Sequence, residues 1–261
     1  MATRPDPTEP YSRSRDADAT TAIPDGTLTH PTAAGGADGL AAHVLRPPIV
    51  VVEGPVDPDD AALFPEESDY VARAVDVRRR EFSTARRFAR EAMARFGLPP
   101  APLVPDENRA PVWPEGIVGS ITHTREHCAV AVARRAEVAS IGIDVETIGR
   151  ASEGIDRLIM VPGEAEPWQS AGFDGPEVTA LVFSAKEAFY KCQFPLTHRM
   201  LAFGDVRVRP SGDGGFTVVP EDVNDEDFDI LRRCGQSGRW HISGGMVVTA
   251  LAPTDRDLEH S

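Results

Sequence analysis

Lysine is almost absent from this sequence. Of 261 residues, 27 are lysine or arginine, yet only Lys186 and Lys191 are lysines, and both flank Glu187. A guanidinium is effectively always protonated, whereas an ammonium on a flexible stem can give up its proton. We therefore expect the segment around these two lysines to be a chemical centre in which arginine would not serve.

Cysteine and long apolar runs are also scarce. The three cysteines, Cys128, Cys192 and Cys234, are an odd number at wide spacing, which excludes a disulfide framework or a zinc site and fits reduced thiols in the cytoplasm. No apolar run approaches the roughly 20 residues of a membrane span, and the N-terminus lacks the pattern of a signal peptide. We expect a cytoplasmic protein with no membrane partner.

Positive charge is in short supply as well. The formal net charge of −14 argues against nucleic acid as a general partner. The exception is residues 71–100, where eight arginines oppose three acidic residues, a net charge of +5. This stretch could bind a phosphate-bearing ligand or an acidic protein, or it could be a solvated helix face with internal ion pairs.

Composition indicates a tail at each end of the chain, and the order of expected helices and strands between the tails suggests two halves of the α+β class. Residues 1–43 contain no Phe, Trp or Val, so they cannot bury enough apolar surface to become ordered, and we expect a disordered tail. Residues 44–145 and 146–252 each read as an α+β half, and residues 253–261 as a frayed tail. A weak similarity between the strands of the two halves suggests an internal two-fold repeat.

Apolar periodicity predicts two long helices. The first runs from about residue 67 to 96, with Val71 and Val75 in its buried stripe, and the second from Pro176 to about Gln193. Between them, residues 149–175 read as a loop with a short helix near 164–169. The predicted strands are 49–53, 117–121, 138–146, 206–210, 216–220, 239–242 and 246–252, while 127–134 could be a strand or a helix.

Two carboxylates occur in the segment Ile141–Glu146. Side chains alternate along a strand, so Asp144 and Glu146 project from the same face. Such a pair repels unless a cation lies between, and Mg²⁺ favours this arrangement, with phosphates completing its shell. The alternative is an ordinary half-exposed strand with its polar residues turned outward.

The helix with the two lysines could complete this site. Glu187 and Lys191 share a helix face, while Lys186 lies about 100° to one side. Glu187 could be a third metal ligand, a general base, or both, and the lysines could neutralise phosphate oxygens. The alternative is a surface ion pair between residues four apart.

A third motif is Gly119-Ser-Ile-Thr-His123. A strand that ends in hydroxyls and a histidine, here Thr122 and His123, could hold phosphate oxygens. The alternative is a core histidine at a strand end. The sequence contains no P-loop, dinucleotide-binding glycine run, nucleophile elbow or H-E-x-x-H motif.

Together, the ordered motifs G-S-I-T-H, I-G-I-D-V-E and F-S-A-K-E-A-F-Y-K resemble those of the 4′-phosphopantetheinyl transferase superfamily. They are most similar to its single-chain branch, which serves siderophore, nonribosomal peptide and polyketide synthases. The segments Leu63–Glu67, Arg78–Phe82 with Arg86, Trp113-Pro114 and Phe194–Leu196 match that branch in order. The resemblance covers about residues 49–252.

This resemblance implies a fold of two similar α/β subdomains related by a pseudo-two-fold axis. It also implies transfer of phosphopantetheine from coenzyme A to a serine of an apo acyl or peptidyl carrier protein, with release of adenosine 3′,5′-bisphosphate. The implied Mg²⁺ ligands are Asp144, Glu146 and Glu187. Lys191 and Lys186 are implied at the pyrophosphate, Thr122 and His123 at coenzyme A phosphates, and Arg78 and Arg86 at the 3′-phosphate.

One position departs from the family pattern. Family members often carry lysine and glycine before a proline of the adenine pocket, where this chain has Asn108-Arg109-Ala110-Pro111.

We expect Glu187 to act as the base and Lys191 to stabilise the leaving phosphate, in a protein that works as a monomer. The competing interpretations are a Mg²⁺-dependent phosphohydrolase of nucleotide-like substrates and a non-catalytic module that binds coenzyme A or a carrier.

Overall fold

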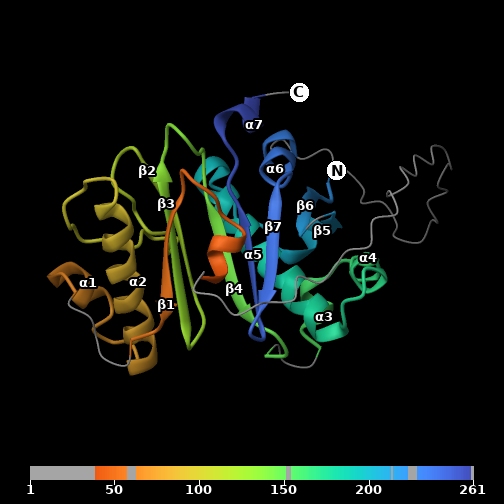
Figure 1. Ribbon diagram of the computed structural model, residues 1–261, viewed down its shortest axis with the longest axis horizontal. Helices are drawn as coiled ribbons and strands as arrows, with labels where there is room; N and C mark the ends of the chain where they lie inside the picture. The colour runs from red at the N-terminus through yellow and green to blue at the C-terminus, as the bar shows by residue number, and fades with distance from the viewer. Residues whose placement is uncertain (1–38, 58–62, 151–153, 213, 223–227, 260–261) are drawn as a thin grey trace, which may run out of the picture.

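Two antiparallel sheets, each backed by one long helix, organise the chain (Figure 1). The computed structural model describes residues 39–57, 63–150, 154–212, 214–222 and 228–259. The smaller sheet has the strand order β1-β3-β2 and the larger the order β4-β8-β7-β6-β5. The strands are β1 Val50–Pro55, β2 Ile117–His123, β3 His127–Arg134, β4 Gly142–Thr147, β5 Val206–Ser211, β6 Gly215–Pro220, β7 Gly238–Ser243 and β8 Met246–Leu251. This arrangement confirms the α+β class.

The first predicted helix is in fact two helices, so the prediction of one continuous helix was wrong. α1 is Pro65–Tyr70 and α2 is Asp76–Ala94. Proline opens α1, and the buried Glu67 accepts the backbone N–H of Phe64 at its start. Glu67 also pairs with Arg90 of α2, which holds α1 back against α2. Val75, predicted to be buried, is 73% exposed at the junction because it precedes α2.

The second long helix, α5 (Gly175–Thr197), covers the larger sheet. It starts where predicted, because Asp174 and Glu177 form a reciprocal capping box and Pro176 occupies the first turn. It continues past the predicted end through Pro195. The remaining short helices are η1 Leu40–His43, α3 Asp156–Ile159, α4 Glu166–Ser170, η2 Phe203–Asp205, α6 Phe228–Cys234 and α7 Asp255–Glu259, of which only α4 corresponds to a predicted helix.

Side-chain hydroxyls join the edges of the two sheets. The Oγ atom of Ser120 on β2 accepts the N–H of Ile143 on β4, and Oγ1 of Thr122 accepts the N–H of Val145. Oxygen atoms at alternate positions of β2 therefore satisfy backbone donors on the facing edge of β4. This seam aligns β4, with its acidic residues, beside the end of β2.

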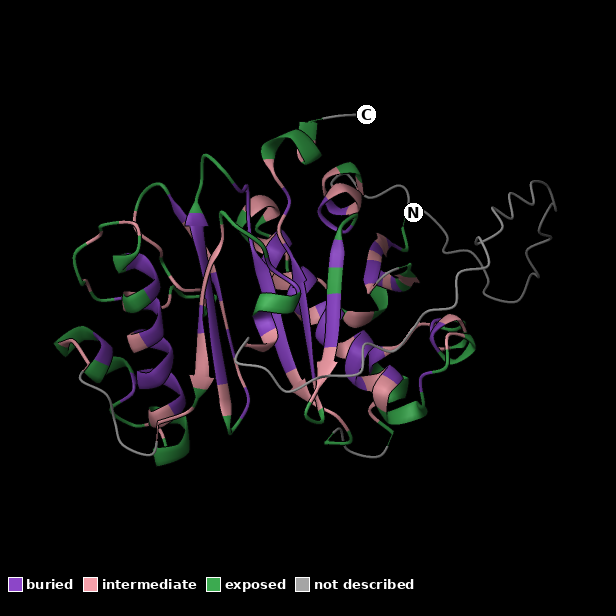
Figure 2. Cartoon of the chain, in the orientation of Figure 1, coloured by how far each residue is buried: buried purple, intermediate pink, exposed green. Residues whose placement is uncertain are grey.

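A central apolar cluster lies between the two sheets. β3 is buried along nearly its whole length (Figure 2). Alternate residues of β3 face α2, and the others face the cluster that β4 and β8 also line. Ala41, Val44 and Leu45 from the beginning of the described chain pack into this same cluster. Each half also has an apolar cluster of its own, and the two halves share this central one.

The predicted boundaries differ from this arrangement in detail. Residues 1–38 lie outside the described residues, but Leu40–His43 form a 3-10 helix with Ala41 buried, so order begins before residue 44. β4 pairs with β8 of the larger sheet, so the boundary expected at residue 145 would divide this strand. The expected C-terminal tail carries α7. Within the described residues, no helix is long and apolar enough to cross a membrane.

Candidate functional site

A cavity of about 980 Å³ lies between the two halves. α2, β2 and the loop of residues 105–113 line it from the first half, and α5 with residues 198–204 lines it from the second. The predicted site residues that line it are Arg78, Arg86, His123, Glu187 and Lys191. Residues more than 100 positions apart in the sequence are therefore brought to one hollow.

Asp144 lies directly behind the Lys191 wall of this cavity. Its Oδ1 atom is 2.6 Å from Lys191 Nζ and accepts a hydrogen bond from Thr122 Oγ1 at 3.1 Å. Lys191 Nζ also reaches the carbonyl oxygen of Ile143 at 3.2 Å. The absence of a side chain at Gly142 permits this approach, because a Cβ atom there would lie 1.8 Å from the Ala188 carbonyl oxygen of α5.

Three carboxylates around Lys191 perturb one another. Burial, then Asp144, raises the pKa of Glu146 to about 7, with Glu187 adding to the rise and Lys191 opposing it. Burial also raises the pKa of Glu187, as does Asp144, while Lys191 lowers it. The site therefore has more negative charge than the single ammonium of Lys191 neutralises.

This charge imbalance suits a hard cation. The Oδ2 atom of Asp144 is buried without a hydrogen-bond partner in the described structure, although such atoms are normally paired. In the part of the chain that the structure describes, no three His, Cys, Asp or Glu side chains stand close enough to hold a metal ion. The donor chemistry of Asp144, Glu146 and Glu187 fits a divalent cation, with Lys191 occupying Asp144 Oδ1 in this arrangement.

The opposite part of the cavity is cationic. Arg78 Nη1 lies 2.6 Å from His123 Nε2, and His123 Nδ1 lies 3.5 Å from Glu81 Oε2. Arginine can only donate, so Nε2 of a neutral His123 accepts and its proton lies on Nδ1, toward Glu81. Burial lowers the pKa of His123, Glu81 opposes this, and Arg78 adds to it, so the neutral form is favoured.

Arg86 is a buried cation whose donors are only partly used. Its Nε donates to the carbonyl oxygen of Leu103, and its guanidinium lies 3.9 Å from the centre of the Phe82 ring. Burial lowers its pKa to about 10, against the influence of Glu67. The remaining N–H groups belong to a side chain that lines the cavity, as an anion site requires.

The basic stretch 71–100 thus divides in two. Arg87 and Arg90 form ion pairs with Asp57 and Glu67, in agreement with the interpretation of internal pairing. Arg78 and Arg86 line the cavity, where Arg78 also lies 3.5 Å from Glu81. Internal ion pairs therefore account for only some of the arginines of α2, and a phosphate-binding role remains an expectation for the two that line the cavity.

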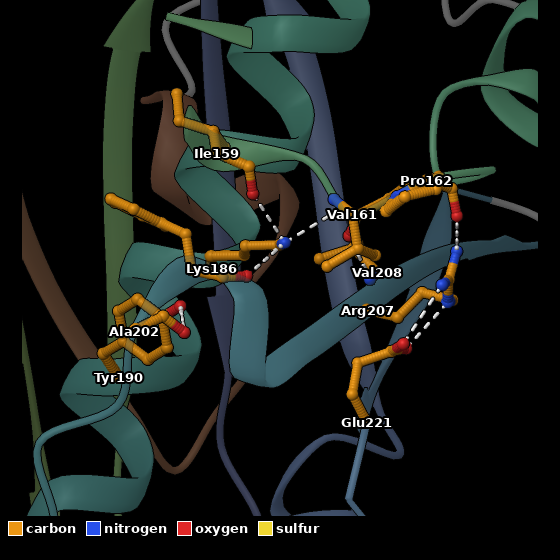
Figure 3. A network of polar contacts seen from close by, with 11 residues as sticks. Ile159, Val161, Pro162, Lys186, Tyr190, Ala202, Arg207, Val208 and Glu221 are labelled. Carbon is orange, nitrogen blue, oxygen red and sulfur yellow. Dashed lines mark hydrogen bonds and ion pairs between the residues drawn. The ribbon is translucent and has the colours of Figure 1, made fainter. Parts of the chain in front are cut away.

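Two predicted phosphate ligands have other partners. Lys186 is fully buried, and its Nζ lies 2.9 Å from Glu164 Oε2, 2.8 Å from the Ile159 carbonyl oxygen and 2.7 Å from that of Phe203 (Figure 3). Thr122 is 3% exposed, and its hydroxyl is taken up by β4. Because protein partners occupy their polar atoms, neither side chain contacts a phosphate site in this arrangement, unlike the expectation from the sequence.

Other cavity residues were not singled out from the sequence. Glu81 lies three residues after Arg78, so helical spacing could have linked it to the cationic cluster. Tyr190 lines the cavity and donates to the carbonyl oxygen of Ala202, which no sequence pattern signals. Arg109, which stands near the position of the family lysine, also lines the cavity, and its φ is 66°.

Comparison with known proteins agrees with this geometry. Residues 66–133 match the family model of the 4′-phosphopantetheinyl transferase N-terminal domain, and residues 140–249 match that of the 4′-phosphopantetheinyl transferase superfamily. The matched segments include both walls of the cavity, and the chain belongs to this superfamily.

Three relatives match most of the chain. 4′-Phosphopantetheinyl transferase Svp of Streptomyces mobaraensis is 43% identical over 203 residues, which are 75% of this chain and 81% of Svp. The transferase Npt of Nocardia iowensis is 37% identical, over 75% of this chain and 91% of Npt. The transferase PptT of Mycobacterium tuberculosis is 35% identical, over 75% of this chain and 88% of PptT. The similarity thus extends across both halves.

Proposed function

We propose that this protein transfers the 4′-phosphopantetheine group of coenzyme A to a serine of an apo acyl or peptidyl carrier protein and releases adenosine 3′,5′-bisphosphate. The observation that carries this proposal is the single cavity with two chemically different walls. Glu187 and Lys191 line one wall, and Arg78, Arg86 and His123 line the other. A ligand with a phosphate at one end and a pyrophosphate farther along would engage both.

The cationic wall would hold the adenosine end of coenzyme A. Arg78 and Arg86 offer fixed donors for the 3′-phosphate, and Arg109 offers a further cation in place of the family lysine. His123 would contact a phosphate from its place beside Arg78. Arg86 is buried and His123 is half-buried, so water weakens their attraction for phosphate less than that of the exposed Arg78 and Arg109.

Asp144, Glu146 and Glu187 would hold Mg²⁺. The unpartnered Asp144 Oδ2 and the raised pKa values of the two glutamates support this assignment, since a bound cation would relieve both. When bound, the ion would neutralise charge on the pyrophosphate. Lys191 has a flexible stem, so it can turn from Asp144 to a phosphate oxygen.

The chain's own residues would then perform the proton and charge chemistry. The serine Oγ forms a bond to the phosphorus that carries pantetheine, and the bond from that phosphorus to the bridging oxygen breaks. Glu187 takes the serine proton, directly or through a water, and Lys191 stabilises the leaving phosphate oxygen. Phosphoryl transfer depends mainly on such positioning and charge neutralisation.

We further propose that the protein works as a monomer in the cytoplasm on carriers of siderophore, nonribosomal peptide or polyketide synthases. All three cysteines are free and buried, as in a reducing compartment. Both walls of the cavity come from one chain, so a second copy is not required to complete the site.

The direct test incubates the full-length protein with coenzyme A, Mg²⁺ and a panel of apo carrier proteins, and follows each carrier by intact mass. We expect one phosphopantetheine to be added to at least one carrier, and none after its acceptor serine is changed to alanine. No addition to any carrier would contradict the proposal.

The same assay separates the competing phosphohydrolase. In a reaction without carrier, a hydrolase would release phosphate or adenosine bisphosphate from coenzyme A at an undiminished rate. A transferase should release adenosine 3′,5′-bisphosphate in proportion to modified carrier. Carrier-independent release would therefore favour hydrolysis.

A further inference from the structure

Several exposed large apolar side chains line the cavity, and Leu158 and Met200 are more exposed than the other two, Val112 and Tyr70. Among the described residues, the most exposed large hydrophobic side chains are Met200 at 80%, Leu158 at 76% and Val75 at 73%. Met200 and Leu158 line the cavity, and Val75 does not. We call Leu158 and Met200 the apolar lip.

A buried polar network holds the two parts of the lip together. Lys186 Nζ donates to the carbonyl oxygens of Ile159 and Phe203, which belong to the segments that carry Leu158 and Met200 (Figure 3). Tyr190 donates to the carbonyl oxygen of Ala202 in the second of these segments. The lip is therefore set on a fixed support, unlike two solvated side chains of a mobile loop.

The loop that follows Leu158 is hydrogen-bonded to β5 of the larger sheet. Glu164 Oε2, which pairs with Lys186, also accepts the N–H of Val161, and its Oε1 accepts the N–H of Val208. Arg207 donates to the carbonyl oxygen of Pro162 and makes a bidentate ion pair with Glu221. A buried ion pair is costly unless its atoms are hydrogen-bonded, and both carboxylate oxygens of Glu164 have such partners. These bonds hold the loop in one position.

The support of the lip also adjoins the reacting groups. Lys186 precedes Glu187 in α5, and Glu187 and Lys191 line the same cavity as Leu158 and Met200. A macromolecule that delivers a hydroxyl to Glu187 must therefore lie against this side of the rim. An exposed apolar pair next to a reaction centre is the expected core of such a contact.

Charge around the lip indicates the kind of partner. Arg157, adjacent to Leu158, is exposed and meets no ion-pair partner within the described part of the chain. Arg109 lines the cavity from the other half, and it too has no ion-pair partner among the described residues. Both cations are open to a partner on a chain of net charge −14, and the exposed Asp156 precedes Arg157. The two cations complement a partner with acidic side chains around an apolar patch.

We propose that the apolar lip, held by the Lys186 network, is the surface on which the acidic carrier protein docks. This inference rests on the proposed function and specifies where the partner binds. It assigns Lys186 a positioning role, in place of the phosphate contact expected from the sequence. Leu158 and Met200 supply the apolar contact, and Arg157 supplies the adjacent charge.

The test measures steady-state transfer by the full-length protein with a carrier that the wild type modifies. Leu158→Ser and Met200→Ser should each raise the KM for the carrier about tenfold, as expected for loss of a buried apolar contact. The KM for coenzyme A and the kcat should stay within about twofold of wild type. Val75→Ser is the matched control, because it changes an equally exposed apolar side chain outside the cavity.

Each contrary outcome has a distinct meaning. An unchanged KM for the carrier in the Leu158→Ser/Met200→Ser double variant would overturn the inference while leaving the proposed function intact. A raised KM for coenzyme A alone would also overturn it, because the lip would then belong to the pantetheine arm. Failure of the wild type to modify any carrier would instead contradict the proposed function.

Two further variants test the charge and the support. Arg157→Glu should raise the KM for the carrier about tenfold at low salt, and the effect should shrink as ionic strength rises. Lys186→Met should raise the KM for the carrier more than the KM for coenzyme A. Equal effects of Lys186→Met on both constants would mean that Lys186 does not act through the lip.

Discussion

Glu187 and Lys191 lie one helical turn apart on α5, and both interact electrostatically with Asp144. Glu187→Gln keeps the shape of the side chain but removes its charge and its capacity to accept a proton. We expect transfer to fall by about 10²–10⁴-fold, as for loss of a general base. The measurement is carrier modification by intact mass, with circular dichroism to verify the fold. Glu115→Gln, at an exposed position outside the cavity, is the control, and near-normal turnover of the Glu187 variant would refute the base assignment.

Lys191 tests whether the scarcity of lysine is chemical or accidental. Lys191→Arg keeps the positive charge, but a planar guanidinium cannot reproduce one nitrogen that lies 2.6 Å from Asp144 Oδ1 and 3.2 Å from the Ile143 carbonyl oxygen. We expect kcat to fall about 100-fold, because displacement of about 1 Å in an active site can have that effect. Single-turnover rates at saturating coenzyme A will measure it. Full activity would show that the position requires only charge.

His123 links the cationic wall to pH. Its pKa in the folded protein is lowered from 6.5, chiefly by burial, so the unfolded chain binds more protons at this residue below about pH 6.5. Its contribution to stability is therefore complete above pH 6.5 and is lost as the pH falls toward the folded-state pKa. Urea unfolding of wild type and His123→Gln between about pH 5 and pH 8 should give a free-energy difference that grows with pH. A difference independent of pH would contradict this expectation.

At the scale of elements, the closest contact between helix and sheet is that of α5 with β4. A Cβ atom at Gly142 would meet the backbone of Ala188, which cannot move without displacing α5. We expect Gly142→Ala to lower the free energy of unfolding by about 3 kcal/mol, at the upper end of the range for overpacking. Chemical denaturation will measure the loss. Gly175→Ala, where nothing lies within 4 Å of the added carbon, should change stability little. Equal stability of the two variants would mean that this contact is not tight.

The elements most readily predicted from the sequence are those with local signals. The start of α5 is fixed by Asp174, Pro176 and Glu177, all within one turn, and it was predicted within one residue. The division between α1 and α2 was missed because the apolar spacing of Val71 and Phe82 continues across the turn. The long-range ion pair of Glu67 with Arg90 holds α1 against α2, and periodicity cannot reveal such a contact.

The same distinction applies to the candidate site. Strand geometry places Asp144 and Glu146 on one face, and helix geometry does the same for Glu187 and Lys191, so each pair could be predicted from the sequence. Lys186 was grouped with Lys191 by composition, but helical geometry turns it away from Glu187, toward Glu164. That partner is 22 residues earlier in the chain, in a segment that reads as loop. Roles that depend on such distant partners require the three-dimensional arrangement.

At the scale of the whole molecule, the two halves are joined by a shared central cluster, beside the cluster that each half has of its own. The central cluster takes residues from β3 of the first half, from β4 and β8 of the second, and from the segment around Leu45. The hydroxyls of Ser120 and Thr122 add hydrogen bonds across the seam. Neither half can therefore bury its inner face alone, and we propose that the halves behave as one cooperative unit.

Unfolding should accordingly be a single transition. Trp113 lies in the first half, whereas Trp168 and Trp240 belong to the core of the second, so fluorescence of Trp113→Phe reports the second half alone. The urea midpoint of this fluorescence should coincide with that from far-ultraviolet circular dichroism, which reports both halves.

Leu45→Ala should lower the free energy of unfolding by about 3 kcal/mol with both signals shifting together, because Leu45 is 6% exposed in the shared cluster. Leu158→Ala, at 76% exposure, is the leucine control and should leave the midpoint unchanged. Separate midpoints for the two signals would mean that each half is stable without the other, and that the site between them can open without global unfolding.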